Sequence, residues 1–175
     1  MNPILGAGVL IGVLCAIWTF VMGFTGWYKD PAMANAFFVV IPIEIGGLLW
    51  GLRRTAAEGR TYGGQVIAGT MMSIVAGVII IASSLLFTMV AFPDYFRELE
   101  AAQRQILQQQ GKSPAEIEET VAASAAASTP MGQAVAGFIG TLVTGIVASA
   151  VIALVFRRKP YSADAAPRPP GSAVA

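Results

Sequence analysis

Four long apolar segments constrain what this chain can fold into. The segments 3–28, 66–93 and 131–156 contain no charged residue, and 34–52 contains only Glu44. A helix needs about 20 mostly apolar residues to cross a hydrocarbon core of about 30 Å. The sequence therefore predicts an all-α polytopic membrane protein with a four-helix transmembrane domain at 1–158. The expected spans are about 4–28, 34–52, 65–92 and 131–156.

Composition limits the kinds of function that we expect of the chain. Hydrophobic residues make up 55% of the chain and charged residues 12%, against about 25% charged in soluble globular proteins. A net charge of +1 gives no reason to expect a nucleic-acid partner. The chain has no histidine and one cysteine, Cys15, within an apolar segment. We therefore expect no metal, no cofactor and no internal disulfide.

The distribution of basic residues predicts the orientation. Lysine and arginine are enriched on the cytoplasmic side of membrane proteins. One side would hold seven basic residues, namely Arg53, Arg54, Arg60, Arg157, Arg158, Lys159 and Arg168. The other would hold four, namely Lys29, Arg97, Arg104 and Lys112. This asymmetry predicts that the N-terminus and the C-terminus are both cytoplasmic.

The long connection 93–129 is too polar to span a membrane, and its pattern is typical of two short helices. Gly111 is placed to end the first, and Ser113 with Glu116 forms a capping box for the second. We expect an outer, periplasmic helical hairpin that either shields the helix ends or docks a partner. Thr129 is expected to cap the fourth span. The segment 159–175 is rich in proline, alanine and serine, which predicts a disordered cytoplasmic tail.

Small residues recur at every fourth position in the last two spans. In lipid, helices associate through small residues that let their backbones approach. The predicted packing seam consists of Gly69, Ser73 and Gly77 on one helix and Gly137, Thr141 and Gly145 on the other. Because these helices run in opposite directions, we expect Gly145 near Gly69, Gly137 near Gly77, and Thr141 opposite Ser73.

Glu44 is the one ionisable residue deep within a predicted span. A charged side chain at that depth costs about 3 kcal/mol on insertion scales, so it is a candidate functional site. It shares a helix face with Gly47, which points it into the bundle. Pro42 removes a backbone donor one turn from Phe38 and should kink the helix. No other span contains a lysine or an arginine to pair with Glu44.

Two interpretations of Glu44 follow. It is either a neutral buried acid, hydrogen-bonded to hydroxyl groups such as those of Thr19, Ser73, Thr141 or Thr144, or a group that handles a proton or a cation. No paired nucleophile and base, and no other catalytic constellation, is visible, so we do not expect an enzyme. The leading hypothesis is an accessory or structural subunit of a larger membrane assembly. The alternative is a small proton- or ion-coupled transporter that uses Glu44. The expected partners are the lipid bilayer and either another membrane protein or a second copy of the chain.

Several local motifs carry a family resemblance. They are Glu44 with 50–53, then 60–65, 92–96 and 111–119. In these the chain resembles a family of small four-helix bacterial inner-membrane proteins classed as a domain of unknown function. The resemblance covers about residues 1–158 and implies a bacterial plasma-membrane location and a four-span fold. It implies no activity and no functional residue.

Overall fold

The computed structural model describes residues 2–124 and 128–156. Within these residues it contains six α-helices and no strand. The helices are α1 (Pro3–Thr25), α2 (Val40–Ala57), α3 (Tyr62–Leu86), α4 (Tyr95–Gln109), α5 (Pro114–Ser124) and α6 (Pro130–Phe156). The predicted disordered tail, 159–175, lies outside the described residues, as do the basic residues after α6.

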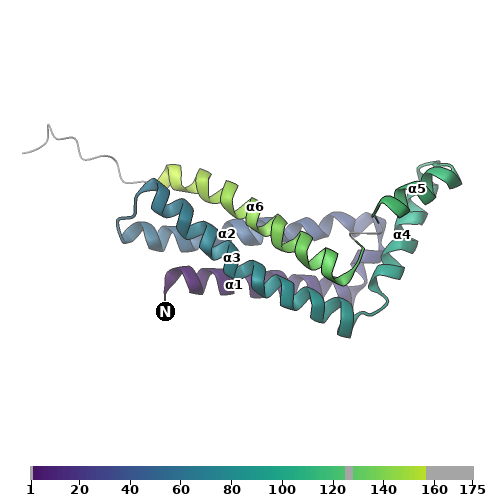
Figure 1. The fold of residues 1–175 in the computed structure, drawn as a ribbon, viewed down its shortest axis with the longest axis horizontal. Helices are drawn as coiled ribbons and strands as arrows, with labels where there is room; N and C mark the ends of the chain where they lie inside the picture. Colours follow the sequence, from purple (N-terminus) through teal and green to yellow (C-terminus); the bar gives the residue numbers. More distant parts are fainter. Residues whose placement is uncertain (1, 125–127, 157–175) are drawn as a thin grey trace, which may run out of the picture.

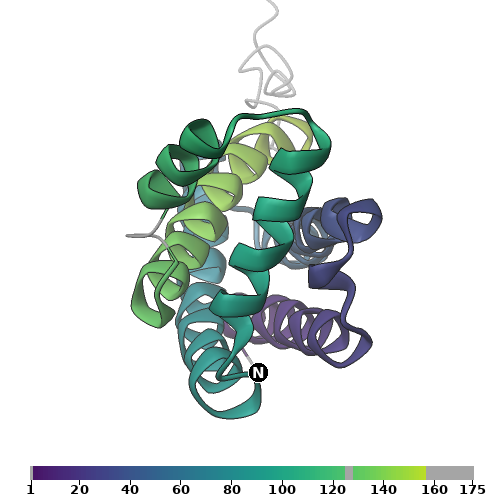
Figure 2. The same ribbon diagram turned by 90° about the vertical axis from the view of Figure 1, so that its right-hand side faces the viewer.

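The four long helices α1, α2, α3 and α6 lie alongside one another, and α4 and α5 project from one end (Figure 1). The start of α1, the α2–α3 connection and the end of α6 share the opposite end. We call these the α4 end and the α2–α3 end. Helix α3 contacts each of the other three long helices. Viewed from the α4 end, α4 crosses the end of the bundle (Figure 2).

The four long helices are suited to a membrane by length and composition. The candidate spans are Pro3–Thr25, Asn35–Ala57, Tyr62–Ala91 and Pro130–Phe156. Large apolar side chains point outward along them, for example Ile17, Val78 and Val147. Apolar surface of this extent is suited to contact with lipid. Each predicted span thus matches a candidate span, although the first ends three residues earlier, the second continues five residues further and the third begins three residues earlier than expected.

Helices α3 and α6 pack through small residues, but in a different register from the predicted one. A Cβ atom built on Gly145 would overlap Ser73 Oγ, and one built on Gly69 would overlap Ser149 Oγ. The prediction paired Gly145 with Gly69 and Thr141 with Ser73, so it is wrong by one helical turn. Ladders with a small residue at every fourth position look alike after a shift of four, which is why the sequence pattern did not exclude this register.

The seam does not continue with small residues on both sides. Gly77 faces the ring of Phe138, whose Cδ2 atom would lie 2.5 Å from a Cβ on that glycine. Gly137, which was expected against Gly77, faces Ile80 instead. One turn along α3 from the contact between Ser73 and Gly145, an aromatic ring thus takes the place of a small residue.

Glycine residues also allow close contacts between α1 and its neighbours α2 and α3. Gly8 lies against the Met72 carbonyl and Val75 of α3. Gly47 of α2 lies against Ile11, and Gly51 lies against Ala7. Gly47 therefore serves the α1–α2 contact.

The start of α2 differs from the predicted kinked helix. Residues Pro31–Val39 form a 3₁₀ helix, η2, and α-helical geometry begins at Val40. Pro42 thus falls in the first turn of α2, directly after the change of helix type. The expected kink inside the helix is replaced by this change of helix type. The Trp18 indole donates a hydrogen bond to the Ala36 carbonyl at 2.9 Å and fixes η2 on α1.

Helix α3 ends in one π-helical turn, η3 (Phe87–Ala91). The Phe92 amide donates to the Phe87 carbonyl at 2.8 Å. Phe87 is buried, and its ring contacts the rings of Phe20, Phe92 and Tyr95. This aromatic cluster closes the α4 end of the α1–α3 pair.

The segment between α3 and α6 forms the two expected helices. The Gly111 and Lys112 amides donate to the Gln108 and Leu107 carbonyls, and Gly111 has φ +74°. These bonds form a Schellman motif. The Ser113 amide donates to Glu116 Oε2 at 2.8 Å, and the Glu116 amide donates to Ser113 Oγ at 3.3 Å. The predicted stop and capping box are both confirmed.

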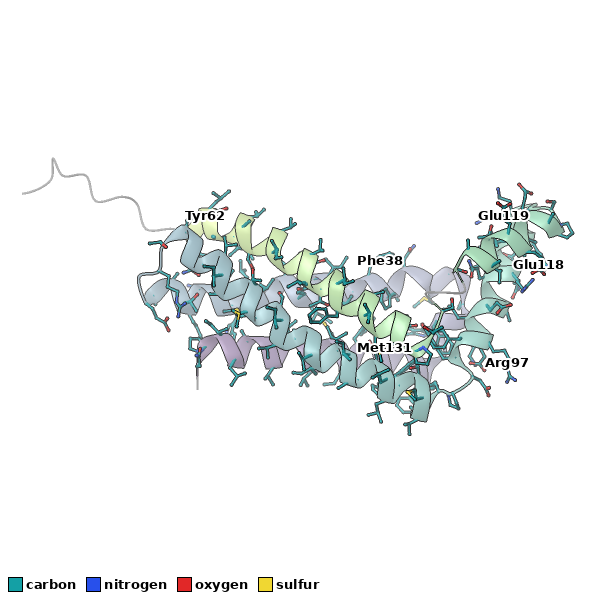
Figure 3. The ribbon with its side chains drawn as sticks, in the orientation of Figure 1. Phe38, Tyr62, Arg97, Glu118, Glu119 and Met131 are labelled. Carbon is teal, nitrogen blue, oxygen red and sulfur yellow. The ribbon has the colours of Figure 1, made fainter. Side chains whose placement is uncertain are left out.

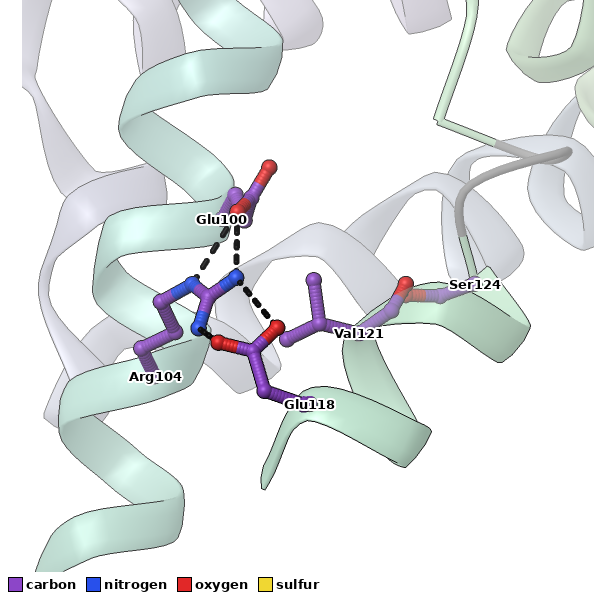
Figure 4. A network of polar contacts seen from close by, with 5 residues as sticks. All are labelled: Glu100, Arg104, Glu118, Val121 and Ser124. Atoms are coloured by element: carbon purple, nitrogen blue, oxygen red, sulfur yellow. Dashed lines mark hydrogen bonds and ion pairs between the residues drawn. The ribbon is translucent and has the colours of Figure 1, made fainter. Parts of the chain in front are cut away.

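An ion-pair network joins α4 to α5. Arg104 contacts Glu100 at 3.0 Å and Glu118 at 2.6 Å (Figure 4). Charged side chains gather on these two helices, among them Arg97, Glu118 and Glu119, while apolar side chains cover the bundle (Figure 3). The α4–α5 pair is thus the strongly polar part of the described structure.

Candidate functional site

Glu44 lies in the interior of the bundle and is 4% exposed. The carboxylate faces α3 and α6, because Ser73 Oγ donates to Glu44 Oε1 at 3.2 Å and a Cβ on Gly145 would lie 3.0 Å from the same oxygen. Ser73 is one of the hydroxyl partners expected from the sequence. The absence of a side chain at Gly145 makes room for both groups.

A cavity of about 470 Å³ lies between α1, η2, α2, α3 and α6. Its lining reaches along α2 as far as Glu44 and along α6 as far as Thr144, so these two residues mark its inner end. Towards the α4 end it reaches Tyr95 and Gln133. The cavity therefore occupies the half of the bundle nearer α4 and ends on the buried carboxylate.

The cavity wall is mostly apolar with several hydroxyl groups. The polar side chains along it include Thr19, Ser83, Ser84, Thr141 and Thr144. Thr19 donates to the Cys15 carbonyl of its own helix at 3.0 Å, and Ser83 donates to the Ile80 carbonyl at 3.1 Å. Their hydroxyl oxygens still have lone pairs that can accept a hydrogen bond from a guest.

Two side chains from different elements meet at the outer end of the cavity. Gln133 Nε2 donates a hydrogen bond to the Tyr95 hydroxyl at 3.4 Å. Burial raises the pKa of Tyr95, and the bond from Gln133 opposes that shift. Tyr95 therefore stays protonated at neutral pH and can donate to an entering group. The sequence did not single out Gln133, because only the fold brings it to the cavity.

The residues predicted as candidates are placed as follows. Pro42 is exposed on the outside of α2, and Gly47 packs against Ile11. Thr141 and Gly137, predicted in the seam, both line the cavity. Of the predicted candidate site, Glu44 alone lines the cavity, and Pro42 and Gly47 do not.

A second set of buried polar groups lies on the other side of Glu44. Thr55, Gln65 and Ser149 are fully buried. Thr55 Oγ1 donates to Gln65 Oε1 at 2.8 Å. Gln65 Nε2 and Ser149 Oγ have no hydrogen-bond partner among the described residues. No signal in the sequence pointed to this set, because glutamine and serine are also common at helix starts and in packing seams.

Among the described residues, the ionisable side chains that line the cavity are Cys15, Glu44 and Tyr95. Within residues 2–124 and 128–156, no group of three or more His, Cys, Asp or Glu side chains could hold a metal ion. Cys15 is buried beside the cavity, and its sulfur lies 3.9 Å from the Val40 carbonyl. What the site offers is a carboxylate at the end of a largely apolar chamber.

Comparison with known proteins gives a family and no function. No curated protein and no solved structure is significantly similar to the chain. A family model described as "Protein of unknown function (DUF4199)" matches residues 7–158, which include most of α1, all of α2, α3 and α6, and the residues that line the cavity. The chain therefore belongs to the DUF4199 family of proteins of unknown function.

Proposed function

We propose that this chain is a non-enzymatic membrane protein that binds a proton or a small cation at Glu44, reached through the cavity. One observation carries the proposal: a buried carboxylate stands at the inner end of a chamber within the membrane-spanning bundle. This geometry favours the transporter hypothesis over a purely structural role for Glu44.

The energetics of a buried carboxylate support this role. Ionised, it only accepts hydrogen bonds, and burial without a counter-charge is costly. Ser73 supplies one hydrogen bond, and no ion pair involves Glu44 in the described parts of the chain. A proton or a cation that enters the cavity would compensate the charge. Intramembrane acids in such settings mark ion pathways and proton relays.

Labelling with dicyclohexylcarbodiimide, an apolar reagent that adds to protonated carboxyl groups, tests the proposal. We expect mass spectrometry to find the adduct on Glu44 in membranes and no adduct at that position in Glu44→Gln. Labelling carried out at a higher pH should give less adduct, because the ionised acid does not react. A Glu44 that stays unlabelled at every pH, in a protein that remains folded, would contradict the proposal.

Two matched variants test whether the reagent reaches Glu44 through the cavity. Gly140 lines the cavity, and a Cβ built on it meets open space. Gly140→Leu should therefore fill the chamber and suppress the labelling of Glu44. Val147 is 60% exposed on the outer face of the same helix, so Val147→Leu should leave the labelling unchanged. Equal labelling of both variants would mean that the reagent does not use the cavity.

A second candidate role, as a subunit of a larger assembly, is favoured by the α4–α5 pair. This pair projects from the bundle (Figure 1) and is held together by the Arg104 network. Such a polar projection offers a docking surface. Purification from the source membrane in mild detergent should then retain a partner, and Arg104→Ala should release it. A chain that purifies alone would contradict this role.

We propose a bacterial inner-membrane location with both termini cytoplasmic and the α4–α5 pair periplasmic. The basic residues Arg53, Arg54 and Arg60 at the α2–α3 end support it. Cysteines at the exposed positions Glu58 and Gln110, each just before a glycine of positive φ, give matched probes. An impermeant thiol reagent should label Gln110→Cys and spare Glu58→Cys in intact cells. The reverse pattern would invert the topology.

A further inference from the structure

Buried polar side chains continue beyond Glu44 towards the α2–α3 end. Five residues, Glu44, Ser73, Ser149, Gln65 and Thr55, are at most 4% exposed, and they come from α2, α3 and α6. The cavity does not extend into this half of the bundle. We call this set the polar column.

The contacts give the column its order. Ser73 bonds to Glu44 and lies opposite Gly145. One turn along α3, Gly69 lies against Ser149. One further turn on, Gln65 bonds to Thr55, which is two residues from the end of α2. The column therefore leads from the end of the cavity to the α2–α3 connection.

Two atoms of the column are unsatisfied. Gln65 Nε2 and Ser149 Oγ are fully buried and have no hydrogen-bond partner among the described residues. Such atoms are rare, and in native proteins buried water commonly satisfies them. Successive levels on α3 are about 6 Å apart, since four residues rise about 1.5 Å each. Two water molecules, joined by hydrogen bonds of about 2.8 Å, bridge that distance.

We propose that the polar column is a hydrated proton path connecting Glu44 with the aqueous phase at the α2–α3 end. The inference rests on the proposed role of Glu44 and extends it. Glu44 gives its proton to an adjacent hydroxyl or water oxygen as that oxygen releases another proton to the next one. Each oxygen forms one O–H bond and breaks one, and the chain of oxygens is restored when its hydroxyl groups and waters rotate back and the carboxylate regains a proton from the cavity. The Gln65 amide orients water and transfers no proton itself.

Proton flux into liposomes that hold the purified protein and a trapped pH-sensitive dye tests the path. Under an imposed potential, we expect Gln65→Met and Ser149→Ala to lower the flux about tenfold, equivalent to about 1.4 kcal/mol on the barrier. Both variants remove the unsatisfied polar atom with little change in shape. Thr70→Val is the control, because its hydroxyl bonds to the Val66 carbonyl of its own helix at 2.9 Å.

The outcomes separate the two proposals. Carbodiimide labelling of Glu44 in Gln65→Met and Ser149→Ala should match the wild type, which shows that the variants fold and keep the cavity. A wild-type flux no greater than that of empty liposomes, or equal flux in the wild type and both variants, would overturn the path and leave the role of Glu44 standing. Absence of label on Glu44 in the wild type would instead overturn the proposed function.

Discussion

The two halves of the bundle are built from the same helices but packed in opposite ways. Towards the α2–α3 end, Gly145 and Gly69 admit the side chains of Ser73 and Ser149, and the polar column beyond Glu44 is fully buried. Towards the α4 end, a Cβ on Gly140 meets open space and the helices line a half-open cavity. The difference shows that glycine in these helices has two uses, because it lets helices approach closely in one half and leaves open volume in the other. Glu44 lies at the boundary between the closely packed half and the half with the cavity.

The largest expected effect is in the tightly packed half. Gly145→Leu would drive a side chain into Ser73 and the Glu44 carboxylate, and overpacking of this kind costs about 3 kcal/mol. Val143→Leu should be nearly neutral, because Val143 is 55% exposed on the outer face. Thermal unfolding in detergent measures both. Equal tolerance would show that the α3–α6 seam is not a packing contact.

A smaller loss is expected where the two halves meet. Ser73→Ala removes the hydrogen bond to Glu44 and leaves a carboxylate oxygen without its donor, which costs about 2 kcal/mol. Ser83→Ala is the matched change in the cavity half, where the hydroxyl donates to its own helix, and should cost less than about 0.5 kcal/mol. A lower melting temperature for Ser83→Ala than for Ser73→Ala would contradict this difference between the halves.

A larger side chain in the cavity half should raise the stability rather than lower it. A Cβ atom at Gly140 meets no neighbour, the rest of the leucine side chain has the cavity to occupy, and leucine replaces a poor helix former, so we expect a gain of up to about 1 kcal/mol for Gly140→Leu. Measured beside Gly145→Leu, it places the same substitution five residues apart on one helix. A strong destabilisation by Gly140→Leu would mean that the cavity closes in the membrane.

The smallest expected effect concerns the ion pair that joins α4 to the segment just after α1. The Lys29 ammonium lies 2.8 Å from the Glu98 carboxylate, which also accepts a hydrogen bond from the Tyr28 hydroxyl. The bonds from Lys29 and Tyr28 lower the pKa of Glu98 below its ordinary value of 4.5. This contact is therefore complete at neutral pH and is lost as the pH falls below about 4.5 through the lowered pKa.

Hydrogen exchange of the first turn of α4 measures this effect. Protection should fall in acid in the wild type, while Glu98→Gln should show little further loss. The expected change is small, because both charged groups are partly exposed and solvent screens their interaction. A variant that loses protection in acid as strongly as the wild type would assign the transition to another group.

Local chemistry was predictable from the sequence. The capping box at Ser113, the Gly111 stop and the cap at Thr129, which accepts from the Gly132 amide at 3.0 Å, depend on residues within a few positions of one another. The Ser73 partner of Glu44 was among those predicted because few hydroxyl groups lie at that depth.

The register and the cavity depend on three-dimensional packing. A ladder of small residues tolerates a shift of one turn, and only the fit of whole helices selects among the registers. The ring of Phe138 against Gly77 fills space that a small residue would leave for backbone approach, and beyond that level Gly137 and Thr141 face the cavity. Their spacing on α6 is the same as that of residues in close contact, so it could not reveal the difference.

The length of α3 together with η3 has a consequence for the surrounding bilayer. Tyr62–Ala91 contains 30 residues and extends about 45 Å, against a hydrocarbon thickness of about 30 Å. The excess requires tilt, protrusion or local thickening of the lipid, each with a cost that grows with the mismatch. Mismatch taken up at the α4 end, where η3 and the aromatic cluster around Phe87 stand, would fall beside the outer end of the cavity. Lipid chain length would then act on the same part of the molecule as the proposed cation entry.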